Sequence, residues 1–266
     1  MITLTSAQLN TWIASIIWPL TRILGVISVA PLFGNVSVPA RVKICLGILL
    51  SVIVAPTVPA IPGADPMSAA GLLILMQQLV IGVAMGFAVR IVFAGVELAG
   101  EISGMTMGLG FASFFDPQTQ ARTSAISQFL ALLTIMVYMA TDLHLLVLGT
   151  LVKSFDLLPI SSGFIANQGM FQFVKLGGRI FSAGVQLSLP IVAALLITNV
   201  ALGILTRAAP QLNIFGIGFP VTIGVGLVMI GVVLPYLMTP LINLIQEGIN
   251  AMGTIATTMA PLPPSP

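Results

Sequence analysis

The sequence carries very little charge and few of the residues that perform chemistry. Of its 266 residues, 9 are Lys or Arg and 7 are Asp or Glu, so charged residues make up 6%, against roughly 25% in soluble domains. There is one histidine and one cysteine, Cys45. A single cysteine excludes an intrachain disulfide and supports no metal cluster. The net charge of +2 comes from scattered basic residues, which form no basic surface for nucleic acid.

These shortages also argue against an enzyme. A serine–histidine pair would have to use His144, and no serine in a recognisable glycine-flanked setting accompanies it. Asp142 and Asp156 do not supply the two aspartates within apolar helices that an intramembrane aspartyl pair needs. The glycine-rich GMTMGLGF follows helical spacing and lacks the lysine of a phosphate-binding loop. We therefore expect no catalytic residue, no cofactor and no metal.

What the sequence has in abundance is apolar residues, at 58% with a mean hydropathy of +1.14. This composition predicts an integral membrane protein without a separate soluble domain. Six apolar runs succeed one another, the second ending at Ala60 and the sixth at Pro240, and the other four are Trp12–Leu32, Met67–Val96, Ala125–Leu151 and Ile180–Thr206. Thr119 and Thr123 are candidate N-caps of the fourth run. An amphipathic helix follows the sixth run. The many prolines indicate bends, so the predicted fold is an all-α, multi-helix membrane protein of bent helical hairpins.

The segment Glu97–Pro117, ELAGEISGMTMGLGFASFFDP, is the centre of the predicted site. At 100° per residue, one third of the helix circumference collects charged residues and glycines, namely Arg90, Glu97, Gly100, Glu101, Gly104 and Gly108. Glycines four residues apart let another helix approach closely. We expect close helix packing at four such positions, which are Gly82, Gly86, Gly100 and Gly104.

Charged residues within apolar helices need partners. Arg22 lies in the middle of the first run, and Arg90 is two turns from Glu97, too far for pairing within one helix. We expect Arg22 to face other helices, and we expect intersubunit charge contacts for five residues, which are Arg22, Arg90, Glu97, Glu101 and Arg207. For Glu97 and Glu101, one turn apart on a buried face, proton transfer is the alternative.

Three phenylalanines, Phe111, Phe114 and Phe115, stand just before Asp116-Pro117, where the chain must leave helical geometry. This pattern indicates a loop that is buried in protein or faces a cavity. Bulky apolar side chains at a constriction can close a pore by excluding water. Ordinary core packing explains the same residues equally well.

The whole chain resembles the FliR family, the R subunits of the flagellar type III protein export gate. The matching segments include WPLTRILGVISVAPLFGNVSVPARVKICLGILL, QQLVIGVAMGF, ELAGEISGMTMGLGFASFFDPQ and LPIVAALLITNVALGILTRAAPQLNIFGIGFP. The resemblance implies a core subunit that, with P and Q subunits, forms the channel for unfolded flagellar proteins and is required for flagellum assembly. It further implies contacts with the B-type switch protein of the export apparatus, the basal-body ring and membrane lipid. The implied location is the bacterial inner membrane, within the flagellar basal body.

The resemblance also implies how the chain is divided. Residues 1–185 would be a P-subunit-like portion with a plug loop at 106–122, residues 186–259 a Q-subunit-like helical hairpin, and residues 260–266 a disordered tail. The channel plug would consist of Phe111, Phe114, Phe115, Asp116 and Pro117. Its flanks would be Met105, Met107, Gly108 and Gly110. Two other functions stay open: a proton-coupled small-solute transporter, and the equivalent subunit of a virulence injectisome.

Overall fold

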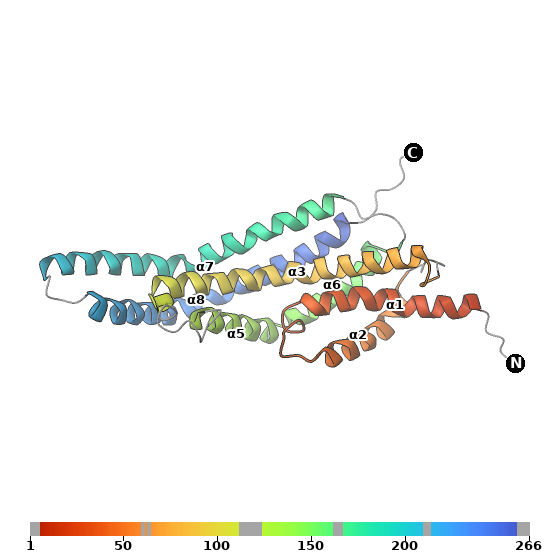
Figure 1. Cartoon of the computed structure of the whole chain (residues 1–266), viewed down its shortest axis with the longest axis horizontal. Helices are drawn as coiled ribbons and strands as arrows, with labels where there is room; N and C mark the ends of the chain where they lie inside the picture. Colours follow the sequence, from red (N-terminus) through yellow and green to blue (C-terminus); the bar gives the residue numbers. More distant parts are fainter. Residues whose placement is uncertain are drawn as a thin grey trace. The chain divides into compact units, whose positions relative to one another are not determined.

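The computed structural model describes residues 6–59, 62, 65–111, 124–161, 167–209 and 214–259. Every regular element in these ranges is a helix, so the all-α prediction is confirmed (Figure 1). In chain order the elements are α1 (Ser6–Val29), α2 (Ala40–Val54), η1 (Ala55–Thr57), α3 (Ala69–Thr106), η2 (Leu109–Phe111), α5 (Ala125–Ala140), α6 (Leu143–Leu157), α7 (Asn167–Ala208) and α8 (Ile214–Thr258).

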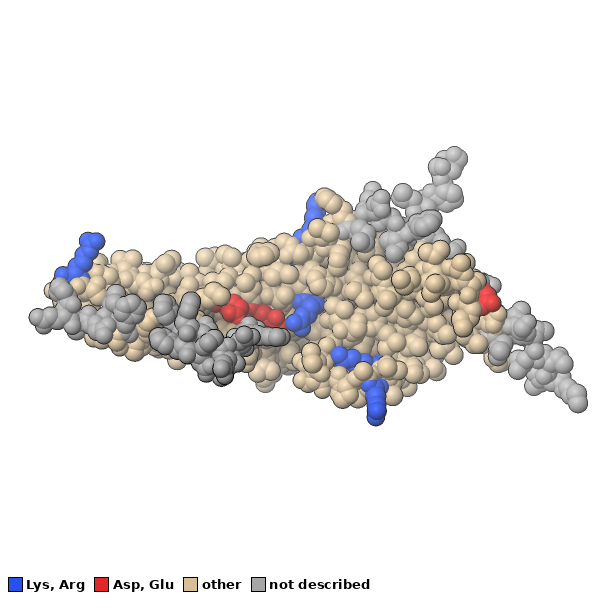
Figure 2. All heavy atoms as spheres, in the orientation of Figure 1, with Lys and Arg blue, Asp and Glu red and all other residues tan. Residues whose placement is uncertain are grey.

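Several helices are long and apolar enough to cross a membrane. Within the described residues, five helices meet this criterion alone, and α5 and α6 together make a sixth candidate. The longest are α3, α7 and α8, with 38, 42 and 45 residues. On the face drawn in Figure 2, charged side chains are few and are separated by broad areas without charge. The chain is therefore an integral membrane protein, as its composition predicts.

Two element boundaries differ from the expected runs. The fourth run is divided between α5 and α6 at Thr141-Asp142, where Asp142 has φ +55. This left-handed conformation ends the regular helix. The sixth run and the amphipathic helix after it form one helix, α8, in spite of Pro220, Pro235 and Pro240 inside it. Prolines are tolerated within membrane helices because neighbouring groups and local adjustments satisfy the freed carbonyls.

The chain folds as two compact units. Unit 1 comprises Met1–Ile91, Asp142–Gly177 and Ile245–Pro266, and unit 2 comprises Val92–Thr141 and Gly178–Leu244. Helices α3, α7 and α8 each contribute residues to both units. The predicted boundary between 185 and 186 falls inside α7, and the division into P-like and Q-like portions stays a prediction. The predicted tail, 260–266, lies outside the described residues.

In unit 1, α1 and α3 approach until their backbones touch. A methyl group on Gly82 would overlap the carbonyl oxygen of Arg22, and one on Gly86 would lie 2.8 Å from the carbonyl oxygen of Val26. On the α1 side, a methyl group on Gly25 would lie 3.0 Å from the Cα of Gly82. Glycine is therefore required at this crossing because any side chain would separate the two helices.

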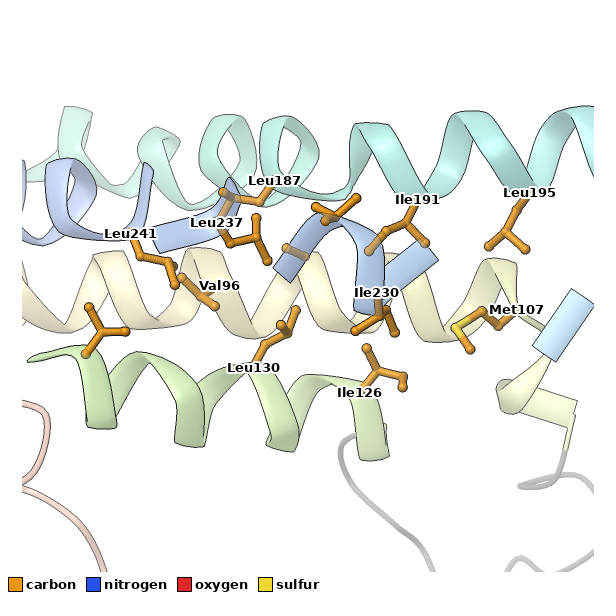
Figure 3. Close-up of a cluster of buried hydrophobic side chains, with 13 residues drawn as sticks. Val96, Met107, Ile126, Leu130, Leu187, Ile191, Leu195, Ile230, Leu237 and Leu241 are labelled. Atoms are coloured by element: carbon orange, nitrogen blue, oxygen red, sulfur yellow. The ribbon is translucent and has the colours of Figure 1, made fainter. Parts of the chain in front are cut away.

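In unit 2, helices α3, α5, α7 and α8 enclose a common apolar core. Figure 3 shows its side chains filling the space between the four helices. From α7, Leu187, Ile191 and Leu195 contribute at every fourth position, as expected for one face of a helix. The other buried members are Val96, Ala99, Met107, Ile126, Leu130, Val137, Ile230, Val233, Leu237 and Leu241. This core holds the last turns of α3 in place.

Candidate functional site

The candidate site lies in unit 2, where α3 ends and α5 begins. We call the contact between the last turns of α3 and the first turn of α5 the α3–α5 joint; it comprises Glu97, Gly100, Glu101 and Gly104 on α3 with Ser124 and Ser127 on the other side. A methyl group on Gly100 would overlap the backbone of Ser127, and one on Gly104 would lie 2.8 Å from Ser124 Oγ. The glycine face of α3 thus seats the start of α5 directly against the α3 backbone.

Hydrogen bonds fix this contact. The backbone N–H of Ser124 donates to Glu101 Oε1 at 2.7 Å, and Ser124 Oγ donates to the carbonyl oxygen of Gly100 at 3.3 Å. Ser127 Oγ donates to the carbonyl oxygen of Glu97 at 2.8 Å. Both serines therefore attach the start of α5 to α3 through polar groups that would otherwise be costly to bury.

Ser124 is also the N-cap of α5, because its Oγ accepts the N–H of Ser127 at 3.1 Å. The candidate caps Thr119 and Thr123 lie outside the described residues, and the cap is one residue beyond them. The sequence signal was present, since Ser124 directly precedes the apolar run and serine is a preferred N-cap residue.

Residues 107 and 108, which directly follow α3, contact α8. Thr222 Oγ1 donates to the carbonyl oxygen of Met107 at 3.0 Å. The Met107 side chain is 0% exposed, and a methyl group on Gly226 would lie 2.5 Å from it. Gly108 has φ +89 beside the Phe219 ring, and this left-handed conformation requires glycine. Met107 and Gly108 are therefore anchored at the base of the predicted plug.

The remaining residues predicted for the plug and its flanks are placed as follows. Met105 is 68% exposed, unlike Met107. Gly110 has open space where a side chain would be, and Phe111 is the last residue of η2. Of the plug loop 106–122, the structure describes 106–111. The residues outside the described ranges are Phe114, Phe115, Asp116 and Pro117.

Arg22 lies in unit 1 and is fully buried at 0% exposure. Its Nε donates to Gln78 Oε1 at 2.7 Å, its Nη1 to the carbonyl oxygen and Oγ of Ser154 at 2.9 and 3.2 Å, and its Nη2 to the carbonyl oxygen of Leu158 at 2.8 Å. The guanidinium carbon is 4.3 Å from the centre of the Phe155 ring. Ser154 and Leu158 lie at the C-terminal end of α6, where the helix dipole is negative. Arg22 therefore joins α1 to α3 and caps α6.

The predicted charged residues thus fall into different environments. The described contacts of Arg22 are with helices of its own chain, whereas the sequence placed it among the intersubunit candidates. Arg90 and Arg207 are exposed, and Glu97 and Glu101 are partly buried. The structure brings Glu97 and Glu101 together with the two serines of α5. Intersubunit contacts stay a prediction for these residues.

The fold and this site define a membrane protein of long helices in close glycine-mediated contact. The sequence model of the bacterial export proteins, family 1, matches residues 13–248. The chain belongs to this family, which includes the flagellar biosynthetic protein FliR.

Similarity to individual relatives extends over nearly the whole chain. The flagellar biosynthetic protein FliR of Pectobacterium carotovorum is 39% identical over 261 residues, which cover 98% of this chain and 99% of the relative. FliR of Escherichia coli K12 is 36% identical over 259 residues, covering 97% and 99%. FliR of Bacillus subtilis is 29% identical over 229 residues, covering 85% and 88%.

Proposed function

We propose that the chain is a core, non-enzymatic subunit of the flagellar protein export gate and is required for flagellum assembly. The observation that carries this proposal is similarity to proteins named for flagellar biosynthesis, at 36–39% identity from end to end. The family description, bacterial export proteins, supports the same conclusion. Several membrane-length helices suit a subunit of an export channel.

In this proposal, P and Q subunits complete the channel, and unfolded flagellar proteins pass through it. The complex lies in the inner membrane within the basal body, next to the B-type switch protein and the ring. Residues 1–185 provide the P-like portion and 186–259 the Q-like hairpin. The exposed apolar side chains of α7, such as Leu196, Ile197 and Val200, are suited to contact with lipid or with such partners.

Phe111, Phe114 and Phe115 are proposed as the seal of the closed channel. Support comes from the two anchors that flank residues 112–123, the Thr222–Met107 bond on one side and the Glu101–Ser124 bond on the other. A plug must resist displacement, and anchored ends restrict how far the chain between them can move. Large apolar side chains held in a narrow channel exclude water and ions.

The test of the seal is replacement of all three phenylalanines by alanine in the assembled complex. We expect ion leakage across the membrane to increase while co-purification with the P and Q subunits is unchanged. The matched control replaces Phe129 and Phe181, which are 44% and 68% exposed on helices α5 and α7, and should leave leakage unchanged. Wild-type permeability in the triple variant would reject the assignment of the seal.

The subunit proposal itself is tested separately, by removing the gene and by purifying the chain. Loss of flagellar filaments in the deletion strain, and co-purification of the chain with P and Q partners, are the expected results. A chain that purifies alone and transports a solute after reconstitution would instead identify the transporter. The names of the relatives favour the flagellar system over an injectisome.

A further inference from the structure

Glu101 receives a hydrogen bond from a neutral backbone amide. The donor is the N–H of Ser124, 2.7 Å from Glu101 Oε1. What Glu101 provides at the α3–α5 joint is an oxygen atom that accepts one hydrogen bond.

The neighbouring contacts show why that atom is needed. Ser124 is the N-cap of α5, and the N–H groups at the start of a helix have no partner within the helix. Ser124 Oγ accepts the N–H of Ser127, and the N–H of Ser124 itself donates to Glu101. Glu101 is one turn after Glu97, whose carbonyl oxygen accepts the hydroxyl of Ser127. Two turns of α3 therefore hold Ser124 and Ser127, which lie about one turn apart at the start of α5.

We propose that Glu101 is a positioning residue that fixes the first turn of α5 on α3 through its acceptor oxygen. Neither a negative charge nor a transferable proton is needed for this role. A glutamine side chain has a carbonyl oxygen at the same distance along the chain and can accept the same bond. Glu101→Gln preserves the acceptor, whereas Glu101→Met removes it at similar side-chain length.

The proposal is tested by hydrogen exchange of the assembled complex, followed in peptides that cover residues 124–130. We expect exchange in Glu101→Gln to stay within about twofold of wild type, since the bond persists with a neutral acceptor. In Glu101→Met, exchange at the start of α5 should increase about fivefold or more, because the donor loses its buried partner. As the control, Glu247→Gln and Glu247→Met change an exposed glutamate in unit 1 and should leave this peptide unchanged.

Two outcomes of the exchange measurement would overturn the proposal. Increased exchange in both Glu101 variants would show that the charge is required, and wild-type exchange in both would show that the bond does not position α5. If Glu101→Met does not yield a complex, the Glu101→Gln variant alone is informative: wild-type protection of residues 124–130 supports the proposal, and lost protection overturns it.

Export of filament protein, measured in the same strains, is a second readout. Glu101→Gln should export at the wild-type level, whereas lost export with intact protection would identify proton transfer and overturn the proposal. Exchange reports on the α3–α5 joint and export on the proposed function, so failure of one can be told from failure of the other.

Discussion

The guanidinium of Arg22 and the side-chain amide of Gln78 form a hydrogen bond of 2.7 Å between α1 and α3. The described acceptors of this fully buried cation are all neutral oxygens, from Gln78, Ser154 and Leu158. Carbonyl groups at the end of α6 carry the partial negative charge of the helix dipole, which offsets part of the cost of burying the guanidinium. Arg22 therefore acts within unit 1 as the common contact of α1, α3 and α6.

Replacing Arg22 tests this role. Arg22→Met should lower the free energy of unfolding by on the order of 3 kcal/mol, because buried acceptors on Gln78 and Leu158 lose their donor. Arg22→Lys should fall between methionine and wild type, since lysine keeps the charge but loses the planar fork and the stacking on Phe155. Thermal unfolding of the purified complex measures both. Arg41→Met, at an exposed position on α2, is the control, and equal stability of Arg22→Met and wild type would refute the role.

Gly100 provides a second test, directed at the α3–α5 joint. Gly100→Ala places a methyl group on the Ser127 backbone and should destabilise the protein by about 1–3 kcal/mol, as overpacking does. Gly203→Ala on α7 is the matched control, because nothing lies within 4 Å of the added methyl group. It should be neutral or stabilising by up to about 1 kcal/mol, owing to the higher helix propensity of alanine. Similar denaturation curves for the two variants would show that α5 is not seated as described.

The helical fold and the family could be predicted because apolar composition and family motifs are read from the sequence without knowing which residues are in contact. Glycine spacing likewise marked Gly82, Gly86, Gly100 and Gly104 as positions of close approach, and the structure places backbone or side-chain atoms against each of them. The spacing of the glycines could not identify the helix that packs against them, which is α1 for Gly82 and Gly86 and α5 for Gly100 and Gly104. That choice depends on tertiary packing.

Other contacts left no readable signal in the sequence. Thr222 and Met107 are 115 residues apart, and a threonine inside an apolar helix bonds its own helix in many structures. For Arg22, the sequence correctly indicated a buried charge facing other helices, but a search for opposite charges could not reveal carbonyl oxygens, since every residue has one. The prolines indicate bends because proline removes a helical hydrogen bond, but α8 continues as one helix through Pro220, Pro235 and Pro240.

The last part of α8 differs in surface from the part before it. In the unit 1 portion of α8, the exposed residues up to Thr258 are all polar, namely Gln246, Glu247, Asn250, Thr254 and Thr257. The opposite side buries Ile245, Ile249 and Met252. Earlier in α8, the exposed side chains include Leu227, Val228 and Val232. Amides exposed to hydrocarbon are costly, so we expect α8 to leave the apolar phase after Pro240.

Cysteine labelling in intact membranes tests where α8 meets water. In a Cys45→Ala background, which removes the single native cysteine, Gln246→Cys and Asn250→Cys should react with a sulfonated maleimide that does not cross membranes. Val228→Cys and Val232→Cys should not react, because lipid or partner helices cover an apolar surface of this kind. Complete labelling of all four after detergent denaturation controls for expression and reactivity. Labelling of Gln246→Cys and Asn250→Cys would show that the membrane-embedded part of α8 ends before Gln246. Protection of both in membranes would indicate that a partner protein covers the polar side of α8 and would contradict the prediction.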